Sequence, residues 1–353
     1  MPHPILATYR LQLHADFTFA DAGDIVPYLA SLGISHLYLS PIFAARRGSQ
    51  HGYGVTDPNQ INSALGGMEG FRRLVDTARR AGLGIILDIV PNHMAADGEN
   101  PAWSETLMIG QRAPRARVFD VDWSLGPILL PFLATPLPVA LAKNQLNLTV
   151  HEAGRFSISY FDHQFSLNPK STACLLEEAG LMALAAPWHA LDLNPTAETA
   201  ALAQDALRKR TEAQDIALHR AFKSASLSDI LTSQYWRLAE WQSASRQMSY
   251  RRFFNIADLI GVRVEDSWVF EETHRLILHL VSEGYVDGLR IDHIDGLADP
   301  ADYLARLRQR IGPDILLVVE KILGVAEALP CWPVDGTTGY DRINDINGLF
   351  VDP

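Results

Sequence analysis

The chain has 353 residues, of which 48% are hydrophobic and 20% are charged, so it can form one large or two ordinary globular domains and is not a disordered protein. Its net charge of −11 argues against nucleic acid as a partner, because phosphate binding needs a basic surface. The two cysteines, Cys174 and Cys331, are too few and too far apart for a disulfide framework or a zinc site.

The first residues, MPHPILATYR, lack the charged and then apolar layout of a secretion signal. No apolar run in the sequence reaches the length that spans a membrane. We therefore expect a cytoplasmic protein without a membrane partner. The first strand of the fold is predicted within residues 5–13.

Four later segments share one design, in which an amphipathic helical pattern is followed by a glycine and then by a short apolar run with polar residues at its end. These segments span residues 25–41, 71–93, 273–293 and 303–323. The glycines suit the left-handed conformation of a helix C-cap, and they are Gly33, Gly82, Gly284 and Gly312. The apolar runs are typical of parallel strands covered on both faces. A sixth strand is predicted near residues 337–341.

Repeated βα units with polar strand ends indicate either a (β/α)8 barrel or a doubly wound parallel sheet. No GxGxxG motif follows the first strand, which weakens a dinucleotide-binding interpretation. Roughly 180 residues separate the second repeat from the third, which predicts a subdomain inserted after the third strand. We place barrel strands 1 to 3 in residues 1–93, the inserted subdomain in 94–250 and the later barrel units in 251–353. The insert has a mixed part and then, over 196–247, an Ala-rich helical part.

The stretch DGLRIDH (287–293) places Arg290 and Asp292 two residues apart in a predicted strand. Alternate residues of a strand share a face, so both side chains point the same way, which in a barrel is toward its axis. A guanidinium beside a carboxylate keeps the carboxylate ionised, as a nucleophile requires. The same two residues are equally consistent with a buried ion pair that only joins strands.

Glu320 ends the apolar run ILLVVE one repeat later, so that neighbouring strand ends would place it beside Asp292. A proton-donating carboxylic acid beside an ionised carboxylate is the arrangement found in glycosidases. Considered alone, Glu320 is better explained as the partner of Lys321 or of a base on another strand.

The third predicted strand ends in DIVPNH (88–93), which brings Asp88, Asn92 and His93 to the same edge. A lone histidine is more often structural, but three polar residues at one strand end, together with two other polar strand ends, favour a site. In the loop HGYGVTD (51–57), Tyr53 can stack on a sugar ring or simply pack the loop.

Taken together, these strand ends resemble the conserved regions of the α-amylase superfamily of glycoside hydrolases. DIVPNH (88–93) looks like the first region, GLRIDH (288–293) the nucleophile region and EKIL (320–323) the acid/base region. A narrower resemblance, to the maltooligosyltrehalose synthase family, runs along nearly the whole chain through ATYRLQL (7–13), HLYLSP (36–41), YRRFF (250–254) and TTGYD to NGLFVDP (338–353). The resemblance implies an α/β fold, a (β/α)8 TIM barrel of the α-amylase type with about six strands present in this chain.

The narrower resemblance implies an intramolecular transglycosylation, in which the reducing-end α-1,4 bond of a maltooligosaccharide becomes an α,α-1,1 bond in trehalose biosynthesis. Asp292 would be the nucleophile and Glu320 the general acid/base of a retaining mechanism. The implied substrate-binding residues are Tyr53, His93, Asp88 and Asn92 around the attacked glucosyl residue, Arg290 beside the nucleophile, His293 and Lys321 on the leaving-glucose side, and Tyr250, Arg251 and Phe254 around the cleaved glucose.

The sequence departs from the family pattern at three places. Gly54 stands where the family's GYD has an aspartate, Asn255 replaces an aspartate after YRRFF, and Ser249 replaces an asparagine before it. The family's third catalytic aspartate lies on a strand later than those predicted here. We therefore expect this chain to be an N-terminal part with little or no turnover on its own.

The implied chemistry needs no redox cofactor, and because the sequence has no oxygen-rich calcium loop we expect no metal. The expected partners are the maltooligosaccharide substrate and, as a functional pairing, a trehalose-releasing hydrolase. Two alternatives stay open: an α-glucan hydrolase that uses the same carboxylates, and a non-catalytic glucan-binding fragment.

Overall fold

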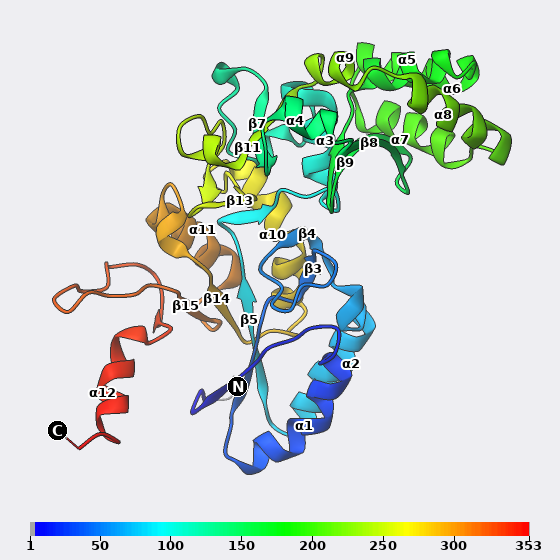
Figure 1. Ribbon diagram of the computed structural model, residues 1–353. Coiled ribbons are helices and arrows are strands. Elements are labelled where there is room, and N and C mark those ends of the chain that lie inside the picture. The colour runs from blue at the N-terminus through cyan, green and yellow to red at the C-terminus, as the bar shows by residue number, and fades with distance from the viewer. Residues whose placement is uncertain (1–3, 353) are drawn as a thin grey trace. The chain divides into compact units, whose positions relative to one another are not determined.

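The computed structural model describes residues 4–352 (Figure 1) and divides them into two compact units. The first unit combines the residues up to Met94 with those from Val262 onward, and the second comprises Ala95–Gly261. The second unit ends beyond residue 250, where the sequence alone placed its boundary. The extension arises because β12 (Arg252–Phe253) pairs with β13 (Ile256–Gly261).

The first unit is built on a six-stranded sheet in which every neighbouring pair is parallel. In sheet order, its strands are β1 (Thr8–Leu11), β2 (His36–Leu39), β5 (Gly84–Ile89), β14 (Gly288–Ile291), β15 (Leu316–Val319) and β16 (Gly336–Thr337). The strands form a curled half of a (β/α)8 barrel (Figure 1). This confirms the barrel class, and β5 and β14 are neighbours although the whole second unit separates them in sequence.

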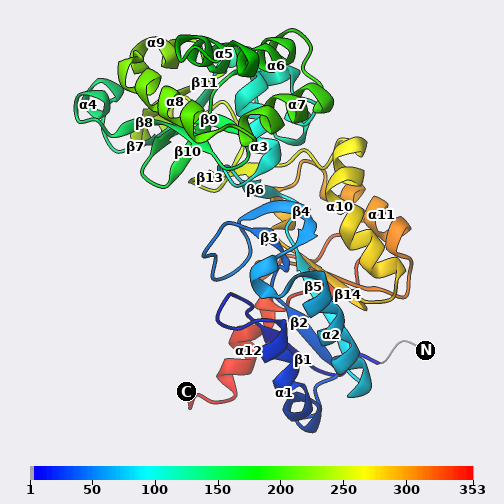
Figure 2. The ribbon, with the colours of Figure 1, turned by 90° about the vertical axis from the view of Figure 1, so that its right-hand side faces the viewer.

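Helices occur in each connection between the first five of these strands, whereas an irregular segment joins β15 to β16. All four predicted C-cap glycines adopt positive φ angles, between 72° and 83°. The helices of the first unit are α1 (Phe19–Ser31), α2 (Gly67–Arg80), α10 (Ser267–Ser282), α11 (Pro300–Ile311) and α12 (Ile343–Gly348). Figure 2 shows α1 beside α2 and α10 beside α11. The unit also contains an antiparallel pair, β3 (Phe43–Ala45) and β4 (Val55–Ile61), and β6 (His93–Ala95) lies at its boundary.

Strand alternation divides the sheet of the first unit into an apolar face and a polar face. Leu87, Leu289 and Leu317 lie in register on adjacent strands, and each is completely buried. Complete burial of a leucine contributes about 1.5–3 kcal/mol, so this row helps to hold the three strands together. The next residues along β5 and β14 are Asp88 and Arg290, which are also in register and therefore share the opposite face.

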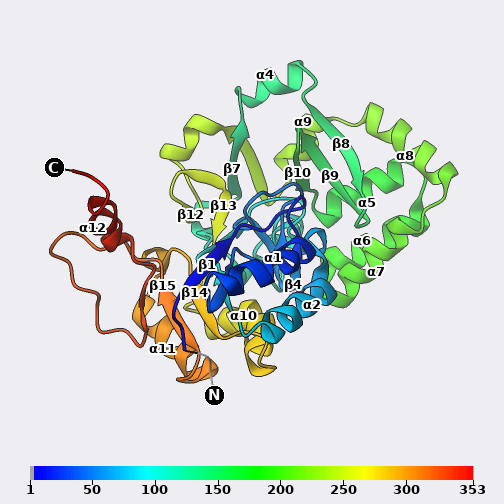
Figure 3. The same cartoon turned by 90° about the horizontal axis from the view of Figure 1, so that it is seen from below.

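The second unit combines small sheets with a group of helices. Its strands are β7 (Ile128–Leu133), β8 (Leu146–His151), β9 (Arg155–Tyr160), β10 (His163–Ser166), β11 (Trp236–Glu240), β12 and β13. Its helices are α3 (Pro101–Ile109), α4 (Leu137–Ala142), α5 (Pro169–Glu178), α6 (Met182–Leu193), α7 (Ala197–Arg208), α8 (Glu212–Ser224) and α9 (Leu227–Thr232). Figure 3 shows α5 to α8 beside the antiparallel β8–β9–β10 sheet, where Phe156 of β9 packs edge-on against Phe222 of α8.

The helical part of the second unit differs in extent from the prediction over 196–247. The run of consecutive helices α5 to α9 begins earlier, at Pro169, because Asn168 caps α5 and proline suits the first helical turn. It ends at Thr232, because the following alternating residues pair in parallel with β7 as strand β11. Among residues 4–352, no helix has both the length and the apolar character needed to cross a membrane.

Candidate active site

Polar residues from three neighbouring strands meet at the carboxyl edge of the sheet in the first unit. Asp88 lies in β5, Arg290 lies opposite it in β14, and Asp292 and Glu320 directly follow β14 and β15. The backbone N–H of Asp292 donates to Ile89, and that of Glu320 donates to Ile291, so ladder hydrogen bonds continue to these residues. The predicted strand-end residues are therefore brought together as expected from parallel pairing.

Arg290 is the centre of the cluster and contacts three carboxyl groups. Its Nη1 atom lies 2.7 Å from Asp88 Oδ1 and 2.6 Å from Asp292 Oδ1, and its Nη2 atom lies 3.0 Å from Glu320 Oε1. The exposed fractions of the side chains are 4% for Arg290, 0% for Asp88, 8% for Asp292 and 25% for Glu320. Glu320 is thus the carboxyl group most open to a molecule approaching the cluster.

One positive charge is shared among three carboxyl groups, and two of these groups, Asp292 and Asp88, have raised pKa values. Burial raises the pKa of Asp292 to about 7, and the charges of Asp88 and Glu320 add to the rise while Arg290 opposes it. Burial also raises the pKa of Asp88, against the effect of Arg290. Near neutral pH the cluster therefore retains a proton, which is the condition for acid–base chemistry at this edge.

The carboxylate of Asp88 is held by two tyrosines as well as by Arg290. Tyr53 and Tyr38 donate hydrogen bonds to Asp88 Oδ2 over 2.6 Å and 3.1 Å. Burial, followed by the charge of Asp88, raises the pKa of Tyr53, so its hydroxyl stays a donor. The tight turn before Tyr53 explains Gly52, because a Cβ there would lie 2.4 Å from the carbonyl oxygen of Pro41.

The backbone after β14 positions the exposed carboxyl group. His293 has a φ of 47°, a left-handed conformation that is costly for a residue with a Cβ. Its N–H donates to Glu320 Oε2 over 2.9 Å, while Arg290 contacts the other oxygen. Both oxygens of Glu320 are therefore oriented by groups from β14 and its following turn.

Lys321, predicted as a substrate contact, bridges two carboxylates. Its Nζ lies 3.2 Å from Asp295 and 2.9 Å from Glu327, whose Oε2 also accepts the N–H of Gly324. These contacts tie the loop after β15 to the 3-10 turn after β14. The ammonium is thus already engaged on the two loops that flank Glu320.

Asn92 and His93 are buried at the end of the segment that follows β5. Asn92 Nδ2 lies 3.3 Å from His93 Nδ1. A Cβ at Gly296 would lie 2.7 Å from Asn92 Oδ1 and 2.3 Å from the ring of His293. Only glycine at position 296 lets the side chains of Asn92 and His293 pack against this turn, and the sequence alone did not reveal that requirement.

Tyr250, Arg251 and Phe254 belong to the second unit. Tyr250 is buried and donates to the carbonyl oxygen of Ala257 over 2.7 Å, and Arg251 pairs with Asp120 at 2.9 Å. Phe254 is 67% exposed. Their predicted contact with glucose stays a prediction.

Two further residues contact the cluster and were missed from the sequence. Tyr38 of β2 donates to Asp88, and Arg10 of β1 donates to the hydroxyl of Tyr53 over 3.0 Å. Arg10 and Tyr38 are in register on adjacent strands. Their signal was a polar or aromatic residue at an inward position of each strand, on the same face as Asp88 and Arg290, because Tyr38 is in register with Ile86, two residues before Asp88.

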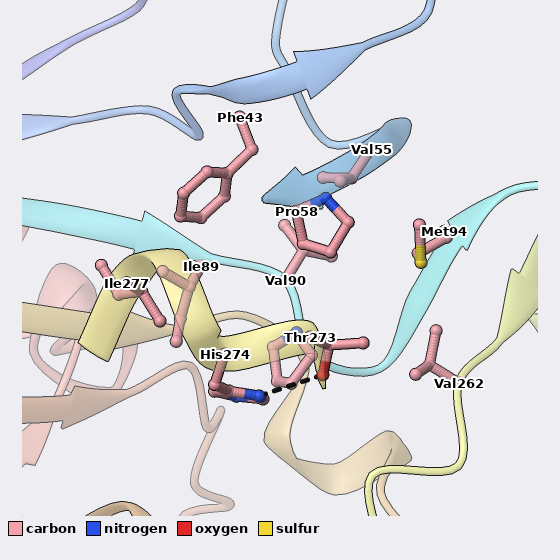
Figure 4. Close-up of a pocket in the computed structure, with 11 residues that line it drawn as sticks. Phe43, Val55, Pro58, Ile89, Val90, Met94, Val262, Thr273, His274 and Ile277 are labelled. Atoms are coloured by element: carbon pink, nitrogen blue, oxygen red, sulfur yellow. Dashed lines mark hydrogen bonds between the residues drawn. The ribbon is translucent and has the colours of Figure 1, made fainter. Parts of the chain in front are cut away.

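A separate pocket in the first unit is lined mostly by apolar side chains (Figure 4). Its lining residues are Phe43, Val55, Pro58, Ile89, Val90, Pro91, Met94, Val262, Thr273, His274 and Ile277. None of them belongs to the carboxylate cluster, and a sugar needs many polar partners, so this pocket does not suit a carbohydrate. Among residues 4–352, no group of three or more His, Cys, Asp or Glu side chains is arranged to hold a metal ion.

Comparisons with known proteins agree with this geometry. The family model described as "Alpha amylase, catalytic domain" matches residues 23–108. A relative from Mycobacterium tuberculosis, assigned as a maltooligosyl trehalose synthase, is 38% identical over all of this chain and 39% of its own length.

Two solved structures show the same relationship. The maltooligosyltrehalose synthase from Arthrobacter ramosus is 35% identical with a TM-score of 0.77, over 99% of this chain and 39% of that one. The DSM5389 glycosyltrehalose synthase is 38% identical with a TM-score of 0.77, over 99% of this chain and 42% of that one. The chain thus spans about two fifths of the length of these relatives. Residues 23–108 thus match an α-amylase catalytic domain, and the chain as a whole is a homologue of about two fifths of the maltooligosyl trehalose synthases.

Proposed function

We propose that the polypeptide containing this chain converts the reducing-end α-1,4 bond of a maltooligosaccharide into an α,α-1,1 bond by intramolecular transglycosylation. The observation that carries the proposal is the contact of one buried guanidinium, Arg290, with the three carboxyl groups of Asp88, Asp292 and Glu320. The homology to maltooligosyl trehalose synthases supports this reaction over the others that such a cluster could perform.

The first step is a displacement at the anomeric carbon. Glu320 gives its proton to the glycosidic oxygen, the bond between that oxygen and the anomeric carbon breaks, and a carboxylate oxygen of Asp292 bonds to the carbon. The glucose that leaves stays bound and turns over. In the second step its anomeric hydroxyl attacks the same carbon, Glu320 takes the hydroxyl proton, and Asp292 is released.

The geometry supports this division of roles between the two carboxyl groups. Glu320 is the more exposed group and can reach a glycosidic oxygen, whereas Asp292 is nearly buried against Arg290. The mechanism requires a protonated Glu320, and a neutral Glu320 does not repel the Asp292 carboxylate, which Arg290 stabilises. Tyr53, His93 and the other predicted substrate contacts of the first unit would line the subsites around this centre.

The test is incubation of a polypeptide of the relatives' full length with maltopentaose. We expect reducing ends to disappear while free glucose does not accumulate, and a net gain in reducing ends would refute the proposed reaction. Asp292→Asn should lower turnover at least ~10³-fold and Glu320→Gln about 10²–10⁴-fold. Asp76→Asn, an exposed change on α2, serves as the matched control and should leave turnover unchanged.

The match to an α-amylase catalytic domain favours hydrolysis as the second candidate function. Hydrolysis would use the same two carboxyl groups, with water in place of the retained glucose, and would raise the number of reducing ends. Maltopentaose binding without either reaction would instead indicate a glucan-binding protein. For the synthase reaction, we further propose a cytoplasmic location and a functional pairing with a hydrolase that releases trehalose from the product.

A further inference from the structure

Arg10 of β1 has no role in the chemistry described above, yet it contacts two aromatic residues of the cluster. Its Nη2 donates to the Tyr53 hydroxyl over 3.0 Å, and its Cζ lies 5.4 Å from the centre of the Tyr38 ring. Its Nη1 donates to Gln12 Oε1 over 2.6 Å, and Gln12 Nε2 donates to the carbonyl oxygen of Gln50 over 2.7 Å. The end of β1 therefore holds the loop of Tyr53 at two points.

The hydrogen bonds fix a direction along this chain of residues. A phenolic hydroxyl has one proton, and the Tyr53 oxygen accepts the N–H of Arg10, so its own proton points to Asp88 2.6 Å away. Asp88 then accepts from Tyr53, Tyr38 and Arg290, and the same Arg290 nitrogen contacts Asp292. One continuous path of hydrogen bonds joins Arg10 to Asp292.

We propose that Arg10 is a positioning residue for the transfer reaction, because it orients the Tyr53 hydroxyl toward Asp88 and thereby sets how Arg290 is shared between Asp88 and Asp292. This inference rests on the proposed function of the cluster. Loss of Arg10 frees the Tyr53 hydroxyl to rotate away from Asp88 and removes a cation near the carboxylates. Both effects favour the protonated carboxyl groups, so less of the enzyme has an ionised nucleophile at a given pH.

The kinetic test compares Arg10→Met, Arg10→Lys, Tyr53→Phe and the double variant Arg10→Met/Tyr53→Phe in the full-length polypeptide. Arg10→Met should lower kcat about tenfold or more with little change in KM, and should move the acid limb of the pH profile to higher pH. Arg10→Lys should recover part of the loss, because it keeps the charge but not the fork of donors. In the Tyr53→Phe background, Arg10→Met should cost clearly less than in the wild type, because only the loss of the nearby cation then remains.

The control is Arg80→Met, an exposed arginine on α2 that hydrogen-bonds Thr77, and it should match the wild type. An Arg10→Met variant with wild-type kinetics and pH profile would overturn the proposal. Equal losses with and without the Tyr53 hydroxyl would also overturn it, because Arg10 would then act by another route.

A second measurement separates this inference from the proposed function. In protein labelled with ¹³C at the tyrosine ring carbon that bears the hydroxyl, the Tyr53 signal is identified by its loss in Tyr53→Phe. We expect that signal to follow the titration of the cluster, with a midpoint that moves to higher pH in Arg10→Met but not in Arg80→Met. This result supports the role of Arg10 even if the wild type forms no α,α-1,1 bond, and an unmoved midpoint refutes it even if the wild type does.

Discussion

Replacing Asp292 with asparagine should stabilise the first unit at neutral pH while it abolishes turnover. Burial raises the pKa of Asp292 from its ordinary 3.8 to about 7. The folded state therefore binds this proton more tightly than the unfolded state does, so stability falls as pH rises through this range. The asparagine side chain is neutral at every pH and avoids that cost.

The magnitude follows from the two pKa values. At about 1.4 kcal/mol per pH unit, the difference between 3.8 and about 7 amounts to about 4 kcal/mol. Asparagine retains an oxygen that can accept the N–H of Arg290, now 2.6 Å from Asp292 Oδ1. We therefore expect a stabilisation of up to about 4 kcal/mol above pH 7, falling to almost zero below pH 4.

Native-state hydrogen exchange of the amides of β14 and β15 measures the stability of this sheet independently of the second unit. The wild type, Asp292→Asn and the exposed control Asp76→Asn are compared at pH 4 and pH 8. A variant that is no more stable than the wild type at pH 8 would refute the reasoning. So would a difference that is the same at both pH values, because the effect would then not arise from ionisation.

Three other perturbations follow from contacts in the two units. Burial lowers the pKa of His274 to about 4. Acidification from about pH 6.5 to pH 4 should therefore destabilise the wild type by about 3 kcal/mol relative to His274→Leu, as measured by urea unfolding at each pH. The variant also loses the hydrogen bond between His274 and Tyr303, which lowers its stability equally at all pH values. Gly261→Ala places a Cβ 2.6 Å from Cζ of Arg251 and should cost about 1–3 kcal/mol, a loss that Arg251→Ala should partly reverse in thermal unfolding. Lys321→Met removes both ion pairs of the ammonium, and the Gly324 amide should then exchange hydrogen several-fold faster than in the wild type.

The repeated pattern of helix, glycine and apolar strand predicted four of the six parallel strands, and the strand ends that meet belong to these four. The sixth strand, predicted near residues 337–341, is the short β16, and a 3-10 turn over Tyr340–Arg342 follows it. Asp88, Arg290, Asp292 and Glu320 were predicted because alternation within a strand and the common edge of parallel strands are local, periodic properties. The extent of the second unit was less predictable. Whether residues beyond 250 pair as β12 and β13 depends on partners that periodicity does not identify.

The stretch DGLRIDHIDGLADP (287–300) separates what sequence determines from what tertiary structure decides. Its pattern of a strand and then polar residues determined that Asp292 would share a face with Arg290. Only the tertiary structure decided the other partners: Asp287 pairs with Arg79, Asp295 with Lys321, and Asp299 caps α11. The physical reason is that these partners lie on other strands and helices, or depend on the conformation that a turn adopts. The same holds for Arg290, whose contact with Asp88 and Glu320 needs two neighbouring strands in one register.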